Sequence, residues 1–337
     1  MTRRTRAVVL GVVVLIVAFV AGLLVGPVHI AAGDAIRWLL PFGERPAGLT
    51  EQQATILADL RLPRVIVAGL VGAALSASGA AYQAVFRNPL ADPYLLGAAA
   101  GAGLGATLAV AFGPSSAFAF AVPLAAFVGA LGGVGLAYGL GRSGLGGRST
   151  TSLILGGVAV ASFLTAVQTL IQQQRSDTLR QVYSWILGRL GTVGWDDARV
   201  ALPSVAIAVT ILWLVRRLLD VIEVGELEAE SLGLNVGRLR LVVVVAASLA
   251  TAAAVSVAGL IGFVGLIVPH TVRLLAGSSY RQVMPLSVLF GASFLILVDL
   301  IARTAIAPAE IPIGVLTAFL GAPFFVVALR RGGRRTV

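Results

Sequence analysis

Apolar stretches of about 20 residues recur along almost the whole chain, and they restrict what it can fold into. A helix of that length spans roughly 30 Å, which is the hydrocarbon thickness of a bilayer. Hydrophobic residues make up 58% of the 337 residues and charged residues 12%, whereas a soluble domain carries about 25% charged residues. We therefore predict an all-α polytopic membrane protein with one transmembrane domain over residues 1–337. About ten spans are predicted, at 7–25, 65–85, 94–112, 118–140, 151–171, 200–215, 241–258, 260–276, 283–305 and 312–329.

The distribution of arginine orients these spans. Most arginines lie in the N-terminal segment or in loops on the same side of the membrane as that segment. The positive-inside rule then predicts a multi-pass protein of the cytoplasmic membrane with both termini in the cytoplasm. Arg3, Arg4 and Arg6 resemble the basic end of a secretory signal. The apolar run after them is longer than a signal core and lacks an Ala-x-Ala site, so we interpret it as a span.

Two missing residue types exclude several activities. The sequence contains neither lysine nor cysteine. A P-loop requires a lysine that reaches the nucleotide phosphates, so the chain is not expected to hydrolyse ATP. Without cysteine there is no disulfide, thiolate metal site or cysteine nucleophile. We expect no catalytic residues, no metal site and no cofactor. We also expect no nucleic-acid partner, because the orientation of the chain in the membrane accounts for its basic charge.

Small residues and loops organise the rest of the chain. Gly97, Gly101 and Gly105 recur at four-residue spacing, which favours close helix–helix packing in a membrane. Outer loops are predicted at 27–64 and 172–199. The second is expected to contain a short interfacial helix at 182–187, anchored by Tyr183 and Trp185.

The inner segment 218–240 is acidic, against the positive-inside trend. It contains five acidic residues, and Gly225 and Gly233 punctuate two predicted short helical pieces. One interpretation is a solvated loop. The other is a docking helix for a cytoplasmic partner, against which Val221, Ile222, Leu227 and Leu232 would be buried.

Several motifs, in order along the chain, resemble the FecCD-type permeases that import iron–siderophores, haem and cobalamin. They include Arg61-Leu-Pro-Arg64, the Arg87-Asn-Pro-Leu-Ala-Asp-Pro-Tyr stretch, the segment from Gly262 to His270, and Glu310-Ile-Pro-Ile-Gly314. The resemblance covers nearly all of the chain from about residue 61 to 330. It implies ten spans in a type II ABC importer, and it makes Pro-His at His270 a family feature rather than a haem ligand.

The resemblance also implies partners and a transport role. The chain would be the permease subunit of an ATP-driven importer that moves a large metal chelate, an iron–siderophore, into the cytoplasm, with haem or cobalamin as alternatives. Its partners would be a second permease copy, a separate ABC ATPase dimer, an extracytoplasmic substrate-binding protein and the lipid bilayer. Segment 218–240 would couple to the ATPase through Gly225, Glu226, Ala229, Ser231, Leu232 and Gly233.

On the outer side, the resemblance assigns docking of the binding protein to Arg61, Arg64 and Arg303. Arg61 and Arg64 are three residues apart and would share a helix face. Ordinary snorkelling at the interface is the alternative. Asp299 precedes Arg303 by four residues, which is the spacing for an ion pair within one helix, so we expect Asp299 to be structural.

Gate and pathway residues follow from the same resemblance. Asn88 and Leu90 match one gate, although they could simply form a turn stiffened by Pro89 and Pro93. Ser149 and Thr150 match the other gate. A pathway lined by Thr165, Gln168 and Thr169 is predicted on the fifth span, where these polar side chains could equally bond neighbouring helices.

An ion-coupled secondary transporter is the main alternative class. Such carriers need ionisable groups near the middle of the membrane. The predicted spans offer Asp299 as their buried acid, and it has Arg303 beside it.

Overall fold

The computed structural model describes residues 3–39, 46, 48–113, 118–143 and 150–332. Within these residues, seven helices are long and apolar enough to cross a bilayer, and three shorter apolar helices accompany them. Together they account for the predicted spans, and the all-α fold class is confirmed. The seven are α1 (Arg3–Leu24), α4 (Leu62–Val85), α6 (Phe118–Ser143), α7 (Thr150–Gln174), α9 (Trp195–Val224), α11 (Val236–Ala258) and α13 (Tyr280–Thr304); the shorter three are α5 (Ala98–Phe112), α12 (Val264–Ala276) and α14 (Ile313–Gly332).

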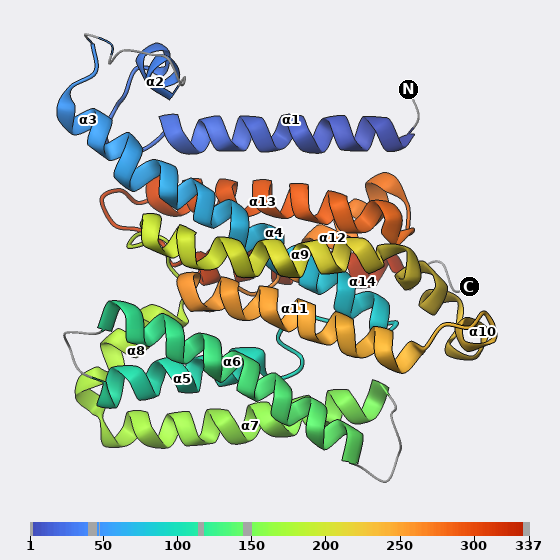
Figure 1. Ribbon diagram of the computed structural model, residues 1–337. Helices are drawn as coiled ribbons and strands as arrows, with labels where there is room; N and C mark the ends of the chain where they lie inside the picture. Colours follow the sequence, from blue (N-terminus) through green and yellow to red (C-terminus); the bar gives the residue numbers. More distant parts are fainter. Residues whose placement is uncertain (1–2, 40–45, 47, 114–117, 144–149, 333–337) are drawn as a thin grey trace.

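Short helical elements connect the long ones and gather at the two ends of the bundle. One end of the bundle contains α10 (Glu226–Ser231), the start of α1 and the end of α14; α2 and α3 lie beyond the opposite end (Figure 1). The first and last spans therefore begin and end at the same end of the bundle, which agrees with an even number of spans. The remaining short elements are α2 (Ala32–Leu39), α3 (Glu51–Thr55), the π-helical turn η1 (Ile56–Arg61), η3 (Ser176–Thr178) and α8 (Leu179–Ile186).

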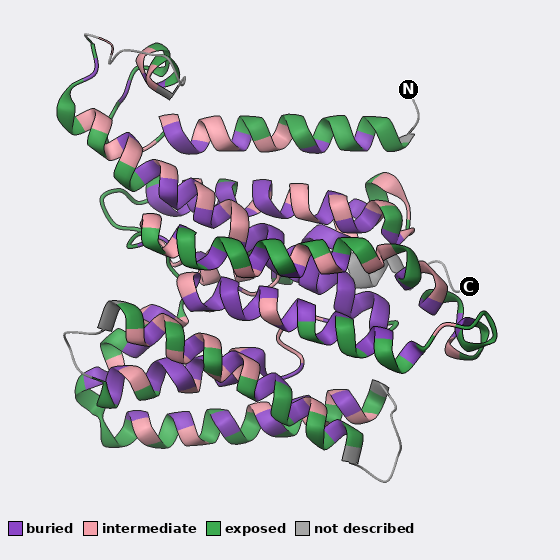
Figure 2. Cartoon of the chain, viewed as in Figure 1, coloured by how far each residue is buried: buried purple, intermediate pink, exposed green. Residues whose placement is uncertain are grey.

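The helices α4 and α11 form the centre of the bundle. In their most apolar stretches, 83% and 72% of the residues are buried, against 17% in α7. Helices α9, α12 and α13 pack around α4, while α1 lies at one side and α5, α6 and α7 at the other (Figures 1 and 2). The exposed apolar surface of the outer helices is what a lipid-facing or subunit-facing helix requires.

Glycine allows the closest helix contacts. A Cβ added at Gly101 on α5 would lie 2.1 Å from the carbonyl oxygen of Gly129 on α6. Position 72 on α4 is equally tight, because its added Cβ would lie 2.1 Å from the Gly291 carbonyl oxygen on α13. The predicted packing role is therefore confirmed for Gly101 and Gly105, where an added Cβ would lie 2.1 Å from a carbonyl oxygen of α6. It is not confirmed for Gly97, which precedes the helix and where an added Cβ would meet no atom closer than 3.4 Å.

Several boundaries differ from the prediction. Helix α9 continues to Val224 instead of ending near residue 215, because Leu219 and Ile222 are buried on its inner face. Segment 218–240 is thus not one loop with two short helices; it contains the end of α9, the single short helix α10 and the start of α11. Helix α5 begins at Ala98 rather than Tyr94, because Gly97 before it has a φ of +80°.

The break between the spans predicted at 241–258 and 260–276 lies at residues 259–263. Gly259 has a φ of +71° and ends α11, and Phe263 has a φ of +66° directly before α12. These left-handed conformations interrupt what is an almost continuous apolar run in the sequence.

The predicted short outer helix at 182–187 is present as α8. Tyr183 is 55% exposed, in keeping with an interfacial anchor, but Trp185 is only 9% exposed. The anchoring role predicted for Trp185 is therefore wrong, because its side chain packs into the bundle. Sequence position alone could not tell which face of this short helix turns inward.

Candidate functional site

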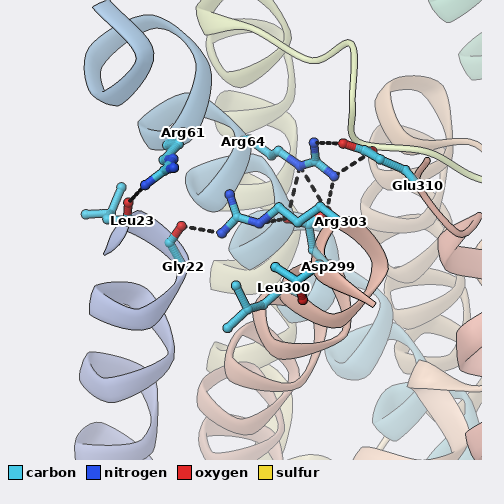
Figure 3. A network of polar contacts seen from close by, with 9 residues as sticks. Gly22, Leu23, Arg61, Arg64, Asp299, Leu300, Arg303 and Glu310 are labelled. Atoms are coloured by element: carbon cyan, nitrogen blue, oxygen red, sulfur yellow. Dashed lines mark hydrogen bonds and ion pairs between the residues drawn. The ribbon is translucent and has the colours of Figure 1, made fainter. Parts of the chain in front are cut away.

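Arg64, Asp299 and Glu310 form a charged network between α4, α13 and the segment before α14, in which Arg64 and Asp299 are buried and Glu310 is exposed (Figure 3). The Arg64 guanidinium donates three hydrogen bonds of 2.8–3.0 Å to the Asp299 carboxylate. It donates two more, of 2.7 and 2.9 Å, to Glu310. The fork of donors in arginine thus binds two carboxylates through five hydrogen bonds, more than the three donors of a lysine could make.

Arg61 and Arg303 bind the C-terminal end of α1. Arg61 donates to the carbonyl oxygens of Leu23 at 2.8 Å, Leu24 at 3.0 Å and Val28 at 2.5 Å. Arg303 donates to the carbonyl oxygen of Gly22. The last carbonyls of a helix lack intrahelical partners, and cations are favoured near them. Both arginines therefore fasten α1 to the bundle at the point where the helix ends.

The structure brings the three predicted docking arginines together but buries them. Arg61, Arg64 and Arg303 are 4%, 9% and 5% exposed. In this conformation their guanidinium groups bind the chain's own oxygens and are not displayed to a partner. Docking through these residues stays a prediction, and the contacts give them a structural role.

Asp299 is structural, as predicted, but its main partner differs from the prediction. Its oxygen lies 3.8 Å from Nε of Arg303, whereas Arg64 approaches to 2.8 Å. The pair within α13 is thus secondary to the pair between α13 and α4. Glu310 was not singled out as a charged partner, although it stands at the start of a recognised motif. Its hydrogen bond to Arg64 lowers the pKa of the Glu310 carboxyl.

The predicted coupling residues lie on and around α10. Glu226 accepts a hydrogen bond of 2.5 Å from Arg240 of α11, and Ala229 is fully buried. Leu232, in contrast, is 76% exposed, and Leu227 is 79% exposed. The short helix is thus fixed to the bundle on one side and presents an apolar surface on the other. Ile222, expected to face a partner, is instead buried within the chain.

The two coupling glycines and Ser231 shape the ends of α10. Gly225 joins α9 to α10, and an added Cβ there would lie 1.7 Å from a Glu228 carboxylate oxygen. Gly233 has a φ of +82°, which favours glycine. Ser231 donates to the Glu228 carbonyl oxygen at 2.7 Å.

Asp220, which no sequence motif distinguishes from the other acids of segment 218–240, connects α9 to α13. Its carboxylate accepts hydrogen bonds from Ser279 Oγ at 2.9 Å and from the Tyr280 backbone N–H at 2.5 Å. Arg281 lies 3.6 Å away. Asp220 therefore caps the N-terminus of α13 from another helix. The helix that leads into α10 is in this way joined to the helix that carries Asp299.

The predicted gate is described only in part. Asn88 Oδ1 accepts a hydrogen bond of 2.9 Å from the Leu90 N–H, as expected if these residues form a turn. The Leu90 residue is 44% exposed. Ser149 lies outside the described residues. Thr150 begins α7, and its side chain also lies outside the described part. The gate assignments stay predictions.

The pathway residues divide between two environments. Thr165 and Thr169 are exposed on α7, and the Thr169 hydroxyl donates to the Thr165 carbonyl oxygen at 2.9 Å. Gln168 is 9% exposed and packs against Gly103 of α5, where an added Cβ would lie 2.7 Å from its Oε1. Gln168 therefore contributes to helix packing here, whereas the two threonines face outward.

No group of three or more His, Cys, Asp and Glu residues suited to a metal ion occurs in the part of the chain that the structure describes. His270 on α12 instead makes an edge-to-face contact with Phe324, with ring centroids 5.5 Å apart.

Comparison with known proteins places the chain in a family. The profile of the FecCD transport family matches residues 14–331. The cobalamin import system permease protein BtuC of Halobacterium salinarum is 41% identical, covering 84% of this chain and 75% of that protein. The iron(3+)-hydroxamate import system permease protein FhuB of Bacillus subtilis is 37% identical, covering 88% of this chain and 76% of that protein.

A solved structure has the same fold. A metal-chelate type ABC transporter in an inward-facing conformation superimposes with a TM-score of 0.82 at 30% identity, covering 95% of this chain and 97% of that one. The matches give no support to the ion-coupled carrier. The bundle of apolar helices, the family profile and the solved structure together identify the chain as a polytopic permease of the metal-chelate type of ABC importer, a member of the FecCD transport family.

Proposed function

We propose that two copies of this chain form the translocation pathway of an ATP-driven importer, powered by a separate ABC ATPase. The observation that carries the proposal is α10. This short helix lies at the end of the bundle that holds both termini, is held by the Glu226–Arg240 pair, and exposes Leu227 and Leu232. Such a rigid apolar projection suits a groove on a partner protein.

A second copy supplies the wall that one chain lacks. Thr165 and Thr169 face outward from α7 in a surface that also exposes Phe163 and Leu170. Polar groups in contact with lipid are unfavourable, whereas polar groups lining a wet passage are not. A homodimer that encloses this face of α7 would bring the threonines of both copies to one passage.

The proposed orientation places the termini and α10 in the cytoplasm and α2, α3 and α8 outside. A substrate-binding protein would then release its substrate at the end of the bundle that contains Arg61, Arg64 and Arg303. Because these arginines are buried, docking through them requires that the α1 and α4 ends separate, or that the partner contacts the surface around them.

The proposed substrate is an iron–siderophore chelate. The hydroxamate relative supports it, since that protein's name gives iron(3+)-hydroxamate import. Cobalamin is a second candidate, because the 41% identical relative is named for cobalamin import.

Substrate-stimulated ATPase activity tests the proposal. The permease, its ABC ATPase and its binding protein would be reconstituted in proteoliposomes, and ferric siderophore, haem and cobalamin would be supplied in turn. Stimulation by ferric siderophore supports the first candidate, and stimulation by cobalamin alone replaces it with the second. Uptake driven by a proton or sodium gradient without any ATPase would contradict the importer itself.

A further inference from the structure

A small basic pocket lies at the α10 end of the bundle, between α6, α7 and α11. Its volume is about 240 Å³, and none of the described residues that line it is acidic. Tyr138 and Arg142 come from α6, and Arg238 and Arg240 come from the first turns of α11. The guanidinium carbon of Arg142 lies 5.6 Å from the centre of the Tyr138 ring. Three arginines thus converge on one hollow at the end of the membrane-spanning helices.

The start of α11 adds to the attraction for an anion. Asn235 caps this helix and accepts a hydrogen bond from the Arg238 N–H at 2.9 Å, and Gly237 lines the pocket. The first N–H groups of a helix and its dipole favour negative charge. Arg240, which is buried, is paired with Glu226 of α10 at 2.5 Å. Arg142 and Arg238 are the exposed cations of the pocket.

A strip of exposed apolar side chains runs from the pocket along α11, away from the end of the bundle that contains α10. Leu241, Val242 and Val245 follow Arg238 at spacings of three, four and seven residues, so they share its helix face. They are 40%, 41% and 58% exposed. A ligand that fits both parts has a compact anionic head and an apolar tail.

We propose that this pocket binds the phosphate headgroup of an anionic phospholipid, with an acyl chain lying along the Leu241–Val245 strip. Arginine pairs well with phosphate through its fork of donors, and basic pockets between transmembrane helices suit anionic headgroups. A free phosphate would use the basic pocket and leave the apolar strip uncovered. The site adjoins α10 through the Arg240–Glu226 pair, so the bound lipid would lie beside the helix proposed to contact the ATPase.

Thermal unfolding of the purified full-length permease in mixed micelles tests the site. Phosphatidylglycerol is expected to raise the melting temperature more than phosphatidylcholine does. In the R142Q/R238Q variant, the phosphatidylglycerol fraction that gives half of this shift should rise about tenfold, because each surface arginine contributes appreciably to anionic-lipid binding. The R142K/R238K variant keeps the charge and should retain much of the preference.

The matched control is R216Q/R217Q, which removes two arginines of α9 outside the pocket and should bind phosphatidylglycerol like the wild type. Native mass spectrometry of the same samples counts the retained lipid and should show its loss in R142Q/R238Q alone. Three results would overturn the proposal: an equal shift with phosphatidylcholine, an unchanged preference in R142Q/R238Q, or the full shift with inorganic phosphate alone. The last would indicate a free-anion site.

Discussion

Arg64 on α4 and Asp299 on α13 are separated by 235 positions in the sequence and joined by three hydrogen bonds of 2.8–3.0 Å. Asp299 is 1% exposed, so its charge is compensated almost entirely by protein groups. Breaking a buried ion pair by removing one partner is strongly unfavourable, because the other charge stays buried. The pair therefore holds α4 and α13 together at the end of the bundle opposite α10.

Substitution of this carboxylate should destabilise the permease itself. Asp299→Ala is expected to lower the free energy of unfolding by about 3–5 kcal/mol, the cost of leaving a buried charge uncompensated. Chemical denaturation in detergent micelles measures it. Asp196→Ala is the matched control, since Asp196 pairs with Arg199 where both side chains are largely exposed, and it should change stability little. Equal effects of the two substitutions would contradict a structural role for Asp299.

Substitution of Arg61 can distinguish a role in folding stability from the predicted role in docking the binding protein. Arg61→Lys keeps the charge, but one ammonium cannot follow the guanidinium to three carbonyl oxygens. We expect a loss of about 1–3 kcal/mol in folding stability, the usual cost of unsatisfied buried acceptors. Affinity for the binding protein, measured on folded protein at low temperature, tests docking. If Arg61→Gln leaves that affinity unchanged, docking does not use this side chain.

The Glu310–Arg64 contact should make stability depend on pH. The hydrogen bond from Arg64 lowers the pKa of Glu310 below its ordinary value of 4.5. A carboxyl with a lowered pKa in the folded state stabilises the fold above its unfolded pKa, and this stabilisation is lost as pH falls through the folded value. Wild type should therefore melt above E310Q at pH 7, and the difference should shrink as the pH falls below 4.5 and through the lowered pKa of Glu310. Melting curves across this range measure it, and a constant difference would contradict the assignment.

The exposed leucines of α10 should matter for assembly and not for folding. Leu227→Asp with Leu232→Asp is expected to abolish copurification with the ABC ATPase while leaving the melting temperature of the permease close to wild type. Both side chains are more than three-quarters exposed, so little apolar burial is lost within the chain. Ile36→Asp on α2, at the opposite end, is the control and should copurify normally. Intact copurification of the leucine variant would exclude α10 as the contact.

Two glycines of α6 offer a matched test of helix packing. A Cβ at Gly129 would lie 2.2 Å from the Gly101 carbonyl oxygen, whereas nothing lies within 4 Å of one at Gly132. Gly129→Ala should lower the melting temperature by several degrees, because α5 and α6 must move apart. Gly132→Ala should leave it unchanged or raise it slightly, since alanine is favoured over glycine in helices by about 1 kcal/mol. The opposite order would contradict the packing described for α5 and α6.

The fold class and the approximate spans could be predicted from the amino-acid sequence. A run of about 20 apolar residues has one low-energy solution in a bilayer, the helix, because every backbone polar group must be satisfied inside it. The same reasoning works for Gly101, since spacing on a helix face is a local property. This local reasoning does not predict the C-terminal end of α9. Burial of Leu219 and Ile222 against other helices extends that helix beyond the apolar run.

Which charged side chains pair with one another depends on how the helices pack. The i, i+4 spacing predicts that Asp299 pairs with Arg303. Arg64, from a helix far away in the sequence, lies closer to the Asp299 carboxylate. Whether Arg61 faces a partner or the end of α1 depends on how α1 packs, which local spacing does not contain. Trp185 and Gln168 are buried for the same reason. Contacts between residues far apart in the chain follow from helix packing, and packing follows from the whole set of surfaces at once.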